Sequence, residues 1–243
     1  MSASTLPRSP RPRLIVDLVI PAFNEEGALG GVIDAVPRGL VRDIIVCDNA
    51  STDATAAVAD AHGATVVSAP TPGYGSACLA GLAYLAAWHP DERPDVVAFC
   101  DGDGSDYPAQ LADVVAPIAS GEADLVIGSR ALGQREPGAM LPHQRFGNWL
   151  ATTLIRWRWG TVFTDLGPMR AVRYDALERI DMQDPDFGWT VEMQVKAAKL
   201  GLRTREVPVD YRARAAGHSK VSGSLSNSVL AGEKILRTIF THS

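Results

Sequence analysis

The sequence has few of the features that mark membrane-spanning, secreted or nucleic-acid-binding proteins. Its 243 residues contain no apolar run near the roughly 20 residues that a spanning helix needs, so any membrane contact is expected at the bilayer surface. Residues 1–13 are rich in Pro, Ser and Arg and predict a disordered leader rather than a secretory signal. The net charge of −5 argues against nucleic acid as a partner, because nucleic-acid binders are basic.

Cysteine is also scarce, and the motifs of several enzyme classes are missing. The three cysteines, Cys47, Cys78 and Cys100, are widely spaced in apolar surroundings, which predicts buried, reduced thiols in a cytoplasmic protein. There is no Walker A motif and no Gly-x-Ser-x-Gly nucleophile elbow. Residues 73–75 (Gly-Tyr-Gly) match only the first two glycines of the dinucleotide fingerprint, and they follow the third predicted strand instead of the first.

What the sequence does contain is a regular alternation of apolar runs and helix-forming segments. The apolar runs predict strands at 14–20, 43–47, 64–67, 96–100, 124–130 and 203–209. Helices are predicted at about 25–36, 53–62, 78–88, 108–119, 143–159, 191–200 and 225–240, with Asn24, Ser51 or Thr52, and Asp106 capping the first, second and fourth. This order predicts a single α/β domain with a mostly parallel sheet and helices on both faces.

The stretch 101–106 (Asp-Gly-Asp-Gly-Ser-Asp) directly follows the fourth predicted strand. Polar residues stand at the same end of three strands: Asn24, Glu25, Asp48, Asp101 and Asp103. Because the carboxyl ends of parallel strands line one crevice, we expect these residues to converge. Two neighbouring carboxylates repel each other unless a cation lies between them, and oxygen ligands on a short loop suit Mg²⁺ or Mn²⁺ with diphosphate oxygens. An ordinary polar turn is the alternative. A calcium EF-hand is excluded, because Asp106 and Ala112 stand where Gly and Glu are needed.

Four segments together resemble family 2 glycosyltransferases, which have the Rossmann-like GT-A fold. They are Pro21-Ala22-Phe23-Asn24-Glu25-Glu26, Asp48-Asn49-Ala50-Ser51-Thr52-Asp53, Gly73-Tyr74-Gly75 and Asp101-Gly102-Asp103. The resemblance covers nearly the whole chain after the leader and is greatest to the polyprenyl-phosphate branch, similar to dolichyl-phosphate mannose synthase. It implies inverting transfer of a sugar from a UDP- or GDP-linked donor to a polyprenyl phosphate at the membrane surface, with Mg²⁺ or Mn²⁺ as cofactor.

The resemblance also implies residue roles on the donor side, in a nucleotide-sugar-binding half at 14–130. The nucleotide-sugar ligands would be Pro21, Ala22, Asn24, Glu25, Asp48 (facing the base), Gly73, Gly75, Asp101, Gly102, Arg130 and Arg170. Asp101 and Asp103 would hold the metal. Relatives often carry Gln or His two residues after the second aspartate, whereas this chain has Ser105 followed by Asp106, so the third metal ligand stays open.

An acceptor-binding half is expected at 131–243, ending in the C-terminal helix. Residues 211–220 resemble the family's Arg…Gly-x-Ser-Lys loop, in which Arg212, Arg214 and Lys220 would supply positive charge to phosphates. A lipid phosphate needs no strong base, whereas a hydroxyl acceptor needs a carboxylate. The candidates for that base are Asp165, Glu192 and Asp186.

Several alternatives stay open at the level of sequence. The acceptor could be a soluble hydroxyl compound, and a sugar nucleotidyltransferase or a binding module without activity are competing functions. Helix 143–159 combines Trp149 and Trp157 with Arg156 and Arg158, which suits either a membrane interface or a core-facing stripe. A cytoplasmic protein is expected, with peripheral attachment to the inner face of the membrane and a homo-oligomer as further options.

Overall fold

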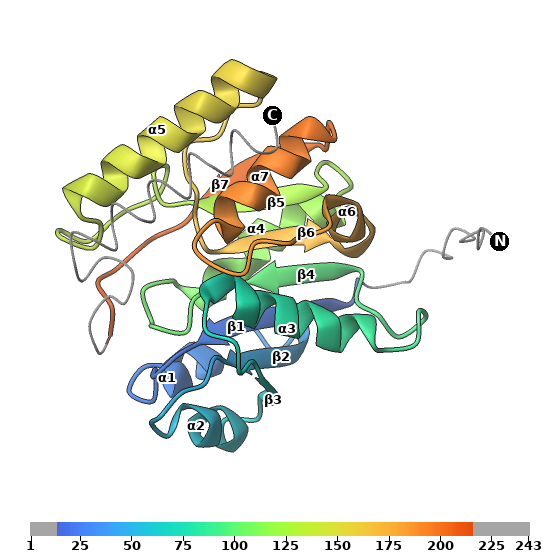
Figure 1. Cartoon of the computed structure of the whole chain (residues 1–243), viewed down its shortest axis with the longest axis vertical. Coiled ribbons are helices and arrows are strands. Elements are labelled where there is room, and N and C mark those ends of the chain that lie inside the picture. Colours follow the sequence, from blue (N-terminus) through green and yellow to red (C-terminus); the bar gives the residue numbers. More distant parts are fainter. Residues whose placement is uncertain (1–13, 216–243) are drawn as a thin grey trace.

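A seven-stranded sheet in the order β3-β2-β1-β4-β6-β5-β7 runs through the molecule (Figure 1). The structure is a computed structural model that describes residues 14–215. The predictions for 1–13, Lys220 and helix 225–240 lie outside the described residues. The strands are β1 (Val16–Ala22), β2 (Val41–Asp48), β3 (Thr65–Ser68), β4 (Val96–Phe99), β5 (Leu125–Ser129), β6 (Arg170–Arg173) and β7 (Thr204–Pro208).

The sheet is mostly parallel, as predicted, and β6 is its exception. This strand lies antiparallel between β4 and β5. The sequence predicted no strand there, because β6 is four residues long and has an arginine at each end. Its insertion separates β4 from β5. The parallel unit β3-β2-β1-β4 therefore forms one side of the sheet, and the pairing of β5 with β7 forms the other.

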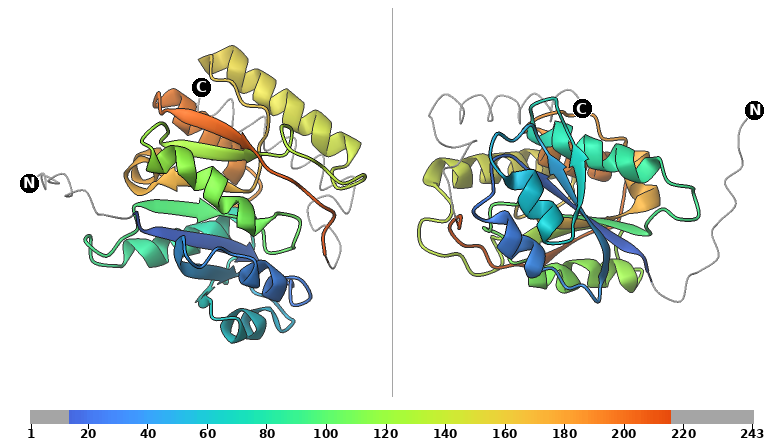
Figure 2. Two further views of the ribbon diagram at one scale, coloured as in Figure 1. Left: turned by 180° about the vertical axis from the view of Figure 1, so that it is seen from behind. Right: turned by 90° about the horizontal axis from the view of Figure 1, so that it is seen from below.

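Helices cover both faces of the sheet, as Figure 2 shows from two further directions. They are α1 (Leu29–Asp34), α2 (Thr55–Ala61), α3 (Tyr74–Ala86), α4 (Leu111–Ala119) after the 3₁₀ turn η1 (Pro108–Gln110), α5 (Pro142–Trp159), α6 (Tyr174–Ile180) and α7 (Trp189–Lys199). One hydrophobic cluster joins the sheet to α1, α2 and α4, and a second joins it to α3, α5, α6 and α7. Burial of these two apolar layers is the main favourable contribution to folding.

The three predicted helix caps are wrong, because the polar side chains bind across loops instead. Asn24 adopts a left-handed backbone (φ 53°), and its Oδ1 accepts a hydrogen bond from Thr52 N (2.8 Å). Ser51 Oγ in turn accepts one from Asn24 N (3.0 Å). Asp106 Oδ2 accepts one from Asp101 N (3.0 Å). The helices α1 and α2 accordingly begin later than predicted, whereas the fourth predicted helix begins at Pro108, as expected, with the turn η1 before α4. None of these helices has a side-chain cap.

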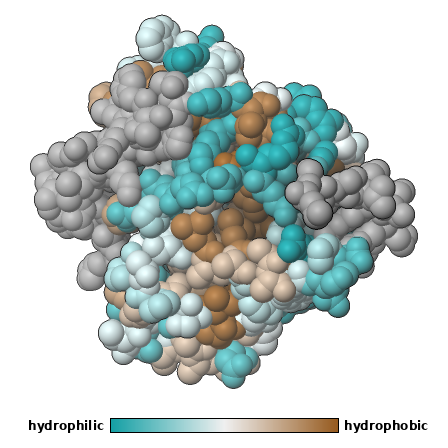
Figure 3. Space-filling model, turned by 45° about the vertical axis from the view of Figure 1, so that its right-hand side comes forward, coloured by the Kyte–Doolittle hydropathy of each residue, from teal (hydrophilic) through white to brown (hydrophobic). Residues whose placement is uncertain are grey.

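The surface differs strongly from one region to another. On the face shown in Figure 3, hydrophobic residues gather in a central hollow between hydrophilic side chains. Helix α5 exposes three large aromatic side chains, Phe146 (61%), Trp149 (58%) and Trp157 (78%). Over residues 14–215, no helix is both long and apolar enough to cross a membrane. The three cysteines are buried and free, as predicted.

Candidate active site

A cavity of about 530 Å³ lies at the carboxyl ends of β1, β2 and β4, within the range of roughly 300–1,000 Å³ that is typical of ligand pockets. Its lining comprises Pro21, Ala22, Phe23, Glu25, Asn49, Ala50, Thr52, Pro72, Gly73, Tyr74, Ala77, Asp101, Gly102, Asp103, Phe187 and Arg214. Segments far apart in the sequence thus meet at one edge of the sheet. The walls are largely apolar, and charged groups gather around the two aspartates.

The rim beside β1 and β2 is held by hydrogen bonds between the segments that follow these two strands. Glu25 N donates to Thr55 Oγ1 (2.8 Å), which fixes the backbone next to the cavity. Asn24 and Asp48 are not among the lining residues, and Asp48 Oδ1 accepts a hydrogen bond from Ser51 N (3.3 Å). These two residues are therefore not part of the cavity lining, and their roles as donor ligands stay predictions.

Asn49 is a site residue that the sequence reasoning did not select. Its Nδ2 donates to the carbonyl oxygens of Ala69 (2.9 Å) and Thr71 (2.7 Å), and its Oδ1 accepts from Gly73 N (2.8 Å). Asn49 thereby joins the end of β2 to the loop before α3. The sequence could have indicated Asn49, because it directly follows Asp48 in a segment that resembles the family.

Gly73 and Gly75 give room to the loop between α6 and α7. A Cβ at Gly73 would lie 2.2 Å from the carbonyl oxygen of Pro185, and one at Gly75 would lie 2.0 Å from that of Asp184. The same Pro185 oxygen accepts a hydrogen bond from Ser76 N (2.7 Å). The two glycines therefore allow a close backbone approach that brings the α6–α7 loop to the cavity wall.

The acidic loop, residues 101–106, places three carboxylates close together. Loss of water on burial raises the pKa of Asp101 well above its usual range, and the negative charges of Asp103 and Asp106 raise it further. Burial likewise raises the pKa of Asp106 to about 7. Tyr74 Oη donates to Asp101 Oδ1 (3.1 Å), and Asp103 Oδ1 accepts from Ser105 N (2.8 Å). Such a cluster favours the approach of a cation.

Asp101 and Asp103 fit a divalent cation that is only partly ligated by protein. Both line the cavity and offer hard carboxylate oxygens. Within residues 14–215, no group of three or more His, Cys, Asp or Glu side chains is arranged to hold a metal ion. Mg²⁺ commonly binds one or two carboxylates and takes its other ligands from phosphates and water. The donor set therefore suits a metal that arrives with a diphosphate.

A basic segment after β7 crosses the acidic loop. Arg214 reaches two carboxylates, with Nη2 2.6 Å from Glu25 Oε1 and Nη1 2.8 Å from Asp103 Oδ2. Arg212 donates from Nε to the Gly104 carbonyl (2.6 Å), and its guanidinium lies 4.7 Å from the ring centre of Tyr107. Arg214, rather than Arg212, is the arginine of this segment that lines the cavity.

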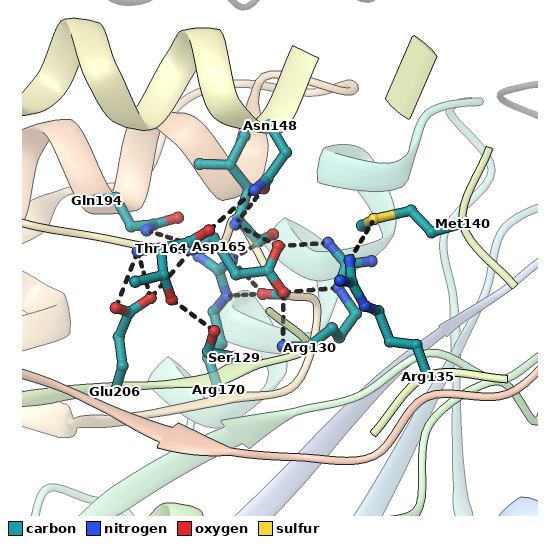
Figure 4. Close-up of polar contacts among 12 residues, drawn as sticks. Ser129, Arg130, Arg135, Met140, Asn148, Thr164, Asp165, Arg170, Gln194 and Glu206 are labelled. Atoms are coloured by element: carbon teal, nitrogen blue, oxygen red, sulfur yellow. Dashed lines mark hydrogen bonds and ion pairs between the residues drawn. The ribbon is translucent and has the colours of Figure 1, made fainter. Parts of the chain in front are cut away.

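Asp165 is the centre of a buried network (Figure 4) and is not among the residues that line the cavity. Arg130 donates to Asp165 Oδ2 from its backbone N (2.8 Å) and Nε (2.7 Å), and to Oδ1 from Nη2 (2.8 Å). Burial alone would lower the pKa of Arg130, but the charge and hydrogen bonds of Asp165 raise it above its usual value. Arg170 donates to the carbonyl oxygens of Gly167 and Thr190, and burial lowers its pKa to about 10. The contacts observed for these three predicted site residues hold the loop before β6.

Glu192 holds the α6–α7 loop. Its carboxylate is 1% exposed and accepts hydrogen bonds from Gln183 N (3.0 Å) and Asp184 N (2.8 Å). Lys196 Nζ lies 2.7 Å from Glu192 Oε1, one helical turn along α7. The loop so anchored brings Phe187 into the cavity wall, while Glu192 and the half-buried Asp186 are not lining residues.

A parallel β-α unit with a cavity and paired aspartates at its carboxyl edge is typical of nucleotide-binding α/β proteins. The family model described as Glycosyl transferase family 2 matches residues 17–181, and the chain belongs to this family. The predicted family and its GT-A fold are thereby confirmed.

Individual relatives match most of the chain. An uncharacterised glycosyltransferase of Mycobacterium tuberculosis is 42% identical over 220 residues, covering 89% of this chain and 94% of the relative. The undecaprenyl-phosphate mannosyltransferase of Micrococcus luteus is 33% identical over 225 residues, covering 85% and 87%. The crystal structure of M. tuberculosis glucosyl-3-phosphoglycerate synthase with Mn²⁺, UDP and glucosyl-3-phosphoglycerate has a TM-score of 0.72 at 26% identity, covering 94% and 80%. The chain is therefore a glycosyltransferase.

Proposed function

We propose that this glycosyltransferase moves a sugar from a UDP- or GDP-linked donor to a polyprenyl phosphate, with inversion at the anomeric carbon and with Mg²⁺ or Mn²⁺ as cofactor. The observation that carries the proposal is the pair Asp101 and Asp103 in a cavity at the carboxyl edge of β1 and β4. The M. luteus relative, whose name includes undecaprenyl phosphate, supports the acceptor. The solved relative with Mn²⁺ and UDP supports the metal and the donor class.

On the donor side, Asp101 and Asp103 would hold the divalent cation. Once bound, the cation would neutralise charge on the leaving nucleoside diphosphate. Arg214 adds positive charge at the same place, and fixed charges of this kind stabilise a charged leaving group in a site that excludes water. Pro21 and Ala22 offer an apolar surface for the nucleoside, and Asp48 stays the proposed neighbour of its base.

In the proposed reaction, an acceptor phosphate oxygen attacks the anomeric carbon and forms the new carbon–oxygen bond. The bond from that carbon to the donor's phosphate oxygen breaks, and the nucleoside diphosphate leaves with the electron pair. A phosphate monoester is already ionised near neutral pH, since its second pKa is about 6. The predicted base candidates Asp165 and Glu192 are bonded to Arg130 and to loop amides, which supports an acceptor that needs no base.

Helix α5 supports a contact with the membrane that holds such a lipid. It contains Arg145, Arg156 and Arg158 and no Asp or Glu, although the whole chain has a net charge of −5. The exposed Trp149 and Trp157 lie on the same helix. Aromatic and basic side chains together suit the interface of an anionic bilayer, so we place peripheral attachment at the inner face of the membrane on α5.

The test is a transfer assay with several acceptors. Radiolabelled UDP-glucose or GDP-mannose is incubated with the full chain, Mg²⁺ or Mn²⁺, and either undecaprenyl phosphate or 3-phosphoglycerate. We expect label in the lipid fraction, dependent on metal and on undecaprenyl phosphate. Transfer only to 3-phosphoglycerate would overturn the lipid acceptor. Release of pyrophosphate from a nucleoside triphosphate and a sugar phosphate would instead identify a nucleotidyltransferase.

A further inference from the structure

Arg214 forms an ionic bridge across the cavity between two strand ends. Its guanidinium contacts Glu25 Oε1 after β1 (2.6 Å) and Asp103 Oδ2 after β4 (2.8 Å). The side chains of both acids are at most 9% exposed, whereas that of Arg214 is 25% exposed. Arg214 therefore provides counter-charge to a predicted metal ligand.

Both carboxylate oxygens of Asp103 have partners. Oδ1 accepts hydrogen bonds from Ser105 N (2.8 Å) and Ser105 Oγ (2.5 Å), and Oδ2 faces Arg214. The bonds from Ser105 belong to the turn of the acidic loop itself. The contact with Arg214 joins segments more than 100 residues apart. A cation that ligates Asp103 through Oδ2 would thus meet the guanidinium at that oxygen.

The backbone around Arg214 is tied to the acidic loop independently of its side chain. Ala215 N donates to the Asp103 carbonyl (3.1 Å), and Arg212 N donates to the Ser105 carbonyl (3.0 Å). A Cβ at Gly104 would lie 2.9 Å from Ala215 Cβ, so glycine permits this close approach. Movement of the Arg214 side chain alone could release Asp103 and leave the guanidinium at the cavity, where it can pair with phosphate oxygens.

We propose that Arg214 and the divalent cation compete for Asp103. When the nucleoside diphosphate binds, its phosphates draw the guanidinium away from Asp103, and the cation takes its place at this carboxylate. Metal alone then binds weakly, and metal and nucleotide raise each other's affinity reciprocally. The inference rests on the proposed donor chemistry and adds a binding order to it. Arg214 would be a donor-binding residue that serves as the counter-ion whenever the donor is absent.

The experiment measures Mn²⁺ binding by electron paramagnetic resonance, without nucleotide and with saturating UDP or GDP. The wild-type chain is compared with Arg214→Ala, Arg214→Lys and the control Arg205→Ala, which removes an exposed arginine of β7 that does not line the cavity. In Arg214→Ala we expect Mn²⁺ alone to bind at least about fivefold more tightly than in wild type. The factor by which nucleotide raises the affinity for Mn²⁺ should fall by a similar amount. Arg205→Ala should stay close to wild type, and Arg214→Lys should lie between wild type and Arg214→Ala, because one ammonium replaces a guanidinium that contacts two carboxylates.

Two outcomes separate the inference from the proposed function. If wild type binds nucleotide with Mn²⁺ but Arg214→Ala leaves the affinity for Mn²⁺ alone unchanged, competition at Asp103 is overturned and the donor site stands. If wild type binds neither UDP nor GDP with Mn²⁺, the proposed donor chemistry fails first. Circular dichroism of each variant checks its fold, and the lysine variant supplies a cation at position 214 should the alanine variant be unstable.

Discussion

The carboxylates at the donor cavity and those in the second half of the chain are the same chemical groups, but their negative charges have different partners. Asp165 has three hydrogen bonds from Arg130, and Glu206 accepts from the backbone amides of Thr164 (2.9 Å) and Asp165 (3.1 Å). Asp101 and Asp103 instead stand beside each other at a cavity, and the charge of Asp103 contributes to the raised pKa of Asp101.

We interpret this difference as one between carboxylates that stabilise loops and carboxylates that we propose to bind the metal and donor. A buried carboxylate with a full set of internal donors stabilises its own loop, and removal of its partner leaves an unpaired charge. Asp101 and Asp103 line a cavity and repel each other, and the ion-pair partner of Asp103, Arg214, is itself partly exposed there, so this pair can still attract an incoming cation. We therefore expect substitutions in the cavity to impair transfer more than stability, and substitutions in the second-half networks to do the reverse.

The largest effect is expected for Asp103→Ala. Loss of a metal-binding carboxylate should lower the rate of sugar transfer at least about 100-fold, because charge on the leaving group is no longer neutralised. Urea unfolding should change by no more than about 1 kcal/mol, since the substitution also removes repulsion from Asp101. The control Asp113→Ala, at an exposed site on α4, should leave both quantities unchanged. Near-normal transfer by Asp103→Ala would contradict the metal assignment.

Arg130→Ala should have the largest effect on stability. It leaves Asp165 buried without its ionic partner, which costs about 3–5 kcal/mol of unfolding free energy. Arg173→Ala is the matched control, because its partners are more exposed and it should cost about 0–1 kcal/mol. Urea titration followed by circular dichroism measures both. If stability is unchanged and transfer is lost completely, Arg130 acts in the donor site, as the family resemblance implies.

Glu192→Gln distinguishes a positioning residue from a general base. We expect kcat to fall less than about tenfold, whereas removal of a base costs about 100-fold or more. The KM for the donor should rise, because the loop that carries Phe187 loses part of its anchor. Lys196→Met should act in the same direction, since Lys196 pairs with Glu192. A large fall in kcat at constant KM would identify Glu192 as the base.

The smallest effect is expected for Arg156→Ser on α5. One basic side chain near an anionic surface contributes about 1 kcal/mol, so binding to phosphatidylglycerol vesicles should weaken about fivefold. Arg38→Ser removes an exposed arginine outside α5 and should leave vesicle binding unchanged. Co-sedimentation measures both variants. Equal binding by wild type and Arg156→Ser would argue against α5 as the membrane contact.

Local sequence patterns predicted much of the fold. Apolar runs predicted β1 to β5 and β7 to within a few residues, because a buried strand needs a continuous run of such residues. The short β6 carried no such signal. The helix caps failed because Asn24, Ser51 and Asp106 have partners elsewhere, and tertiary hydrogen bonds outweigh a local preference for the cap position.

The sequence by itself determined the α/β class, the family, and the gathering of acidic and glycine-rich segments at one sheet edge. The class and the shared edge follow from order and periodicity along the chain, because parallel pairing brings the strand ends to one edge, whereas the family follows from the resemblance of four segments. Only the tertiary structure decided which charged groups are already paired. Asp165 lies 35 residues from Arg130, and Glu25 lies 189 residues from Arg214. Such partners are chosen by packing in three dimensions, so the same residue types become a buried support in one place and a ligand site in another.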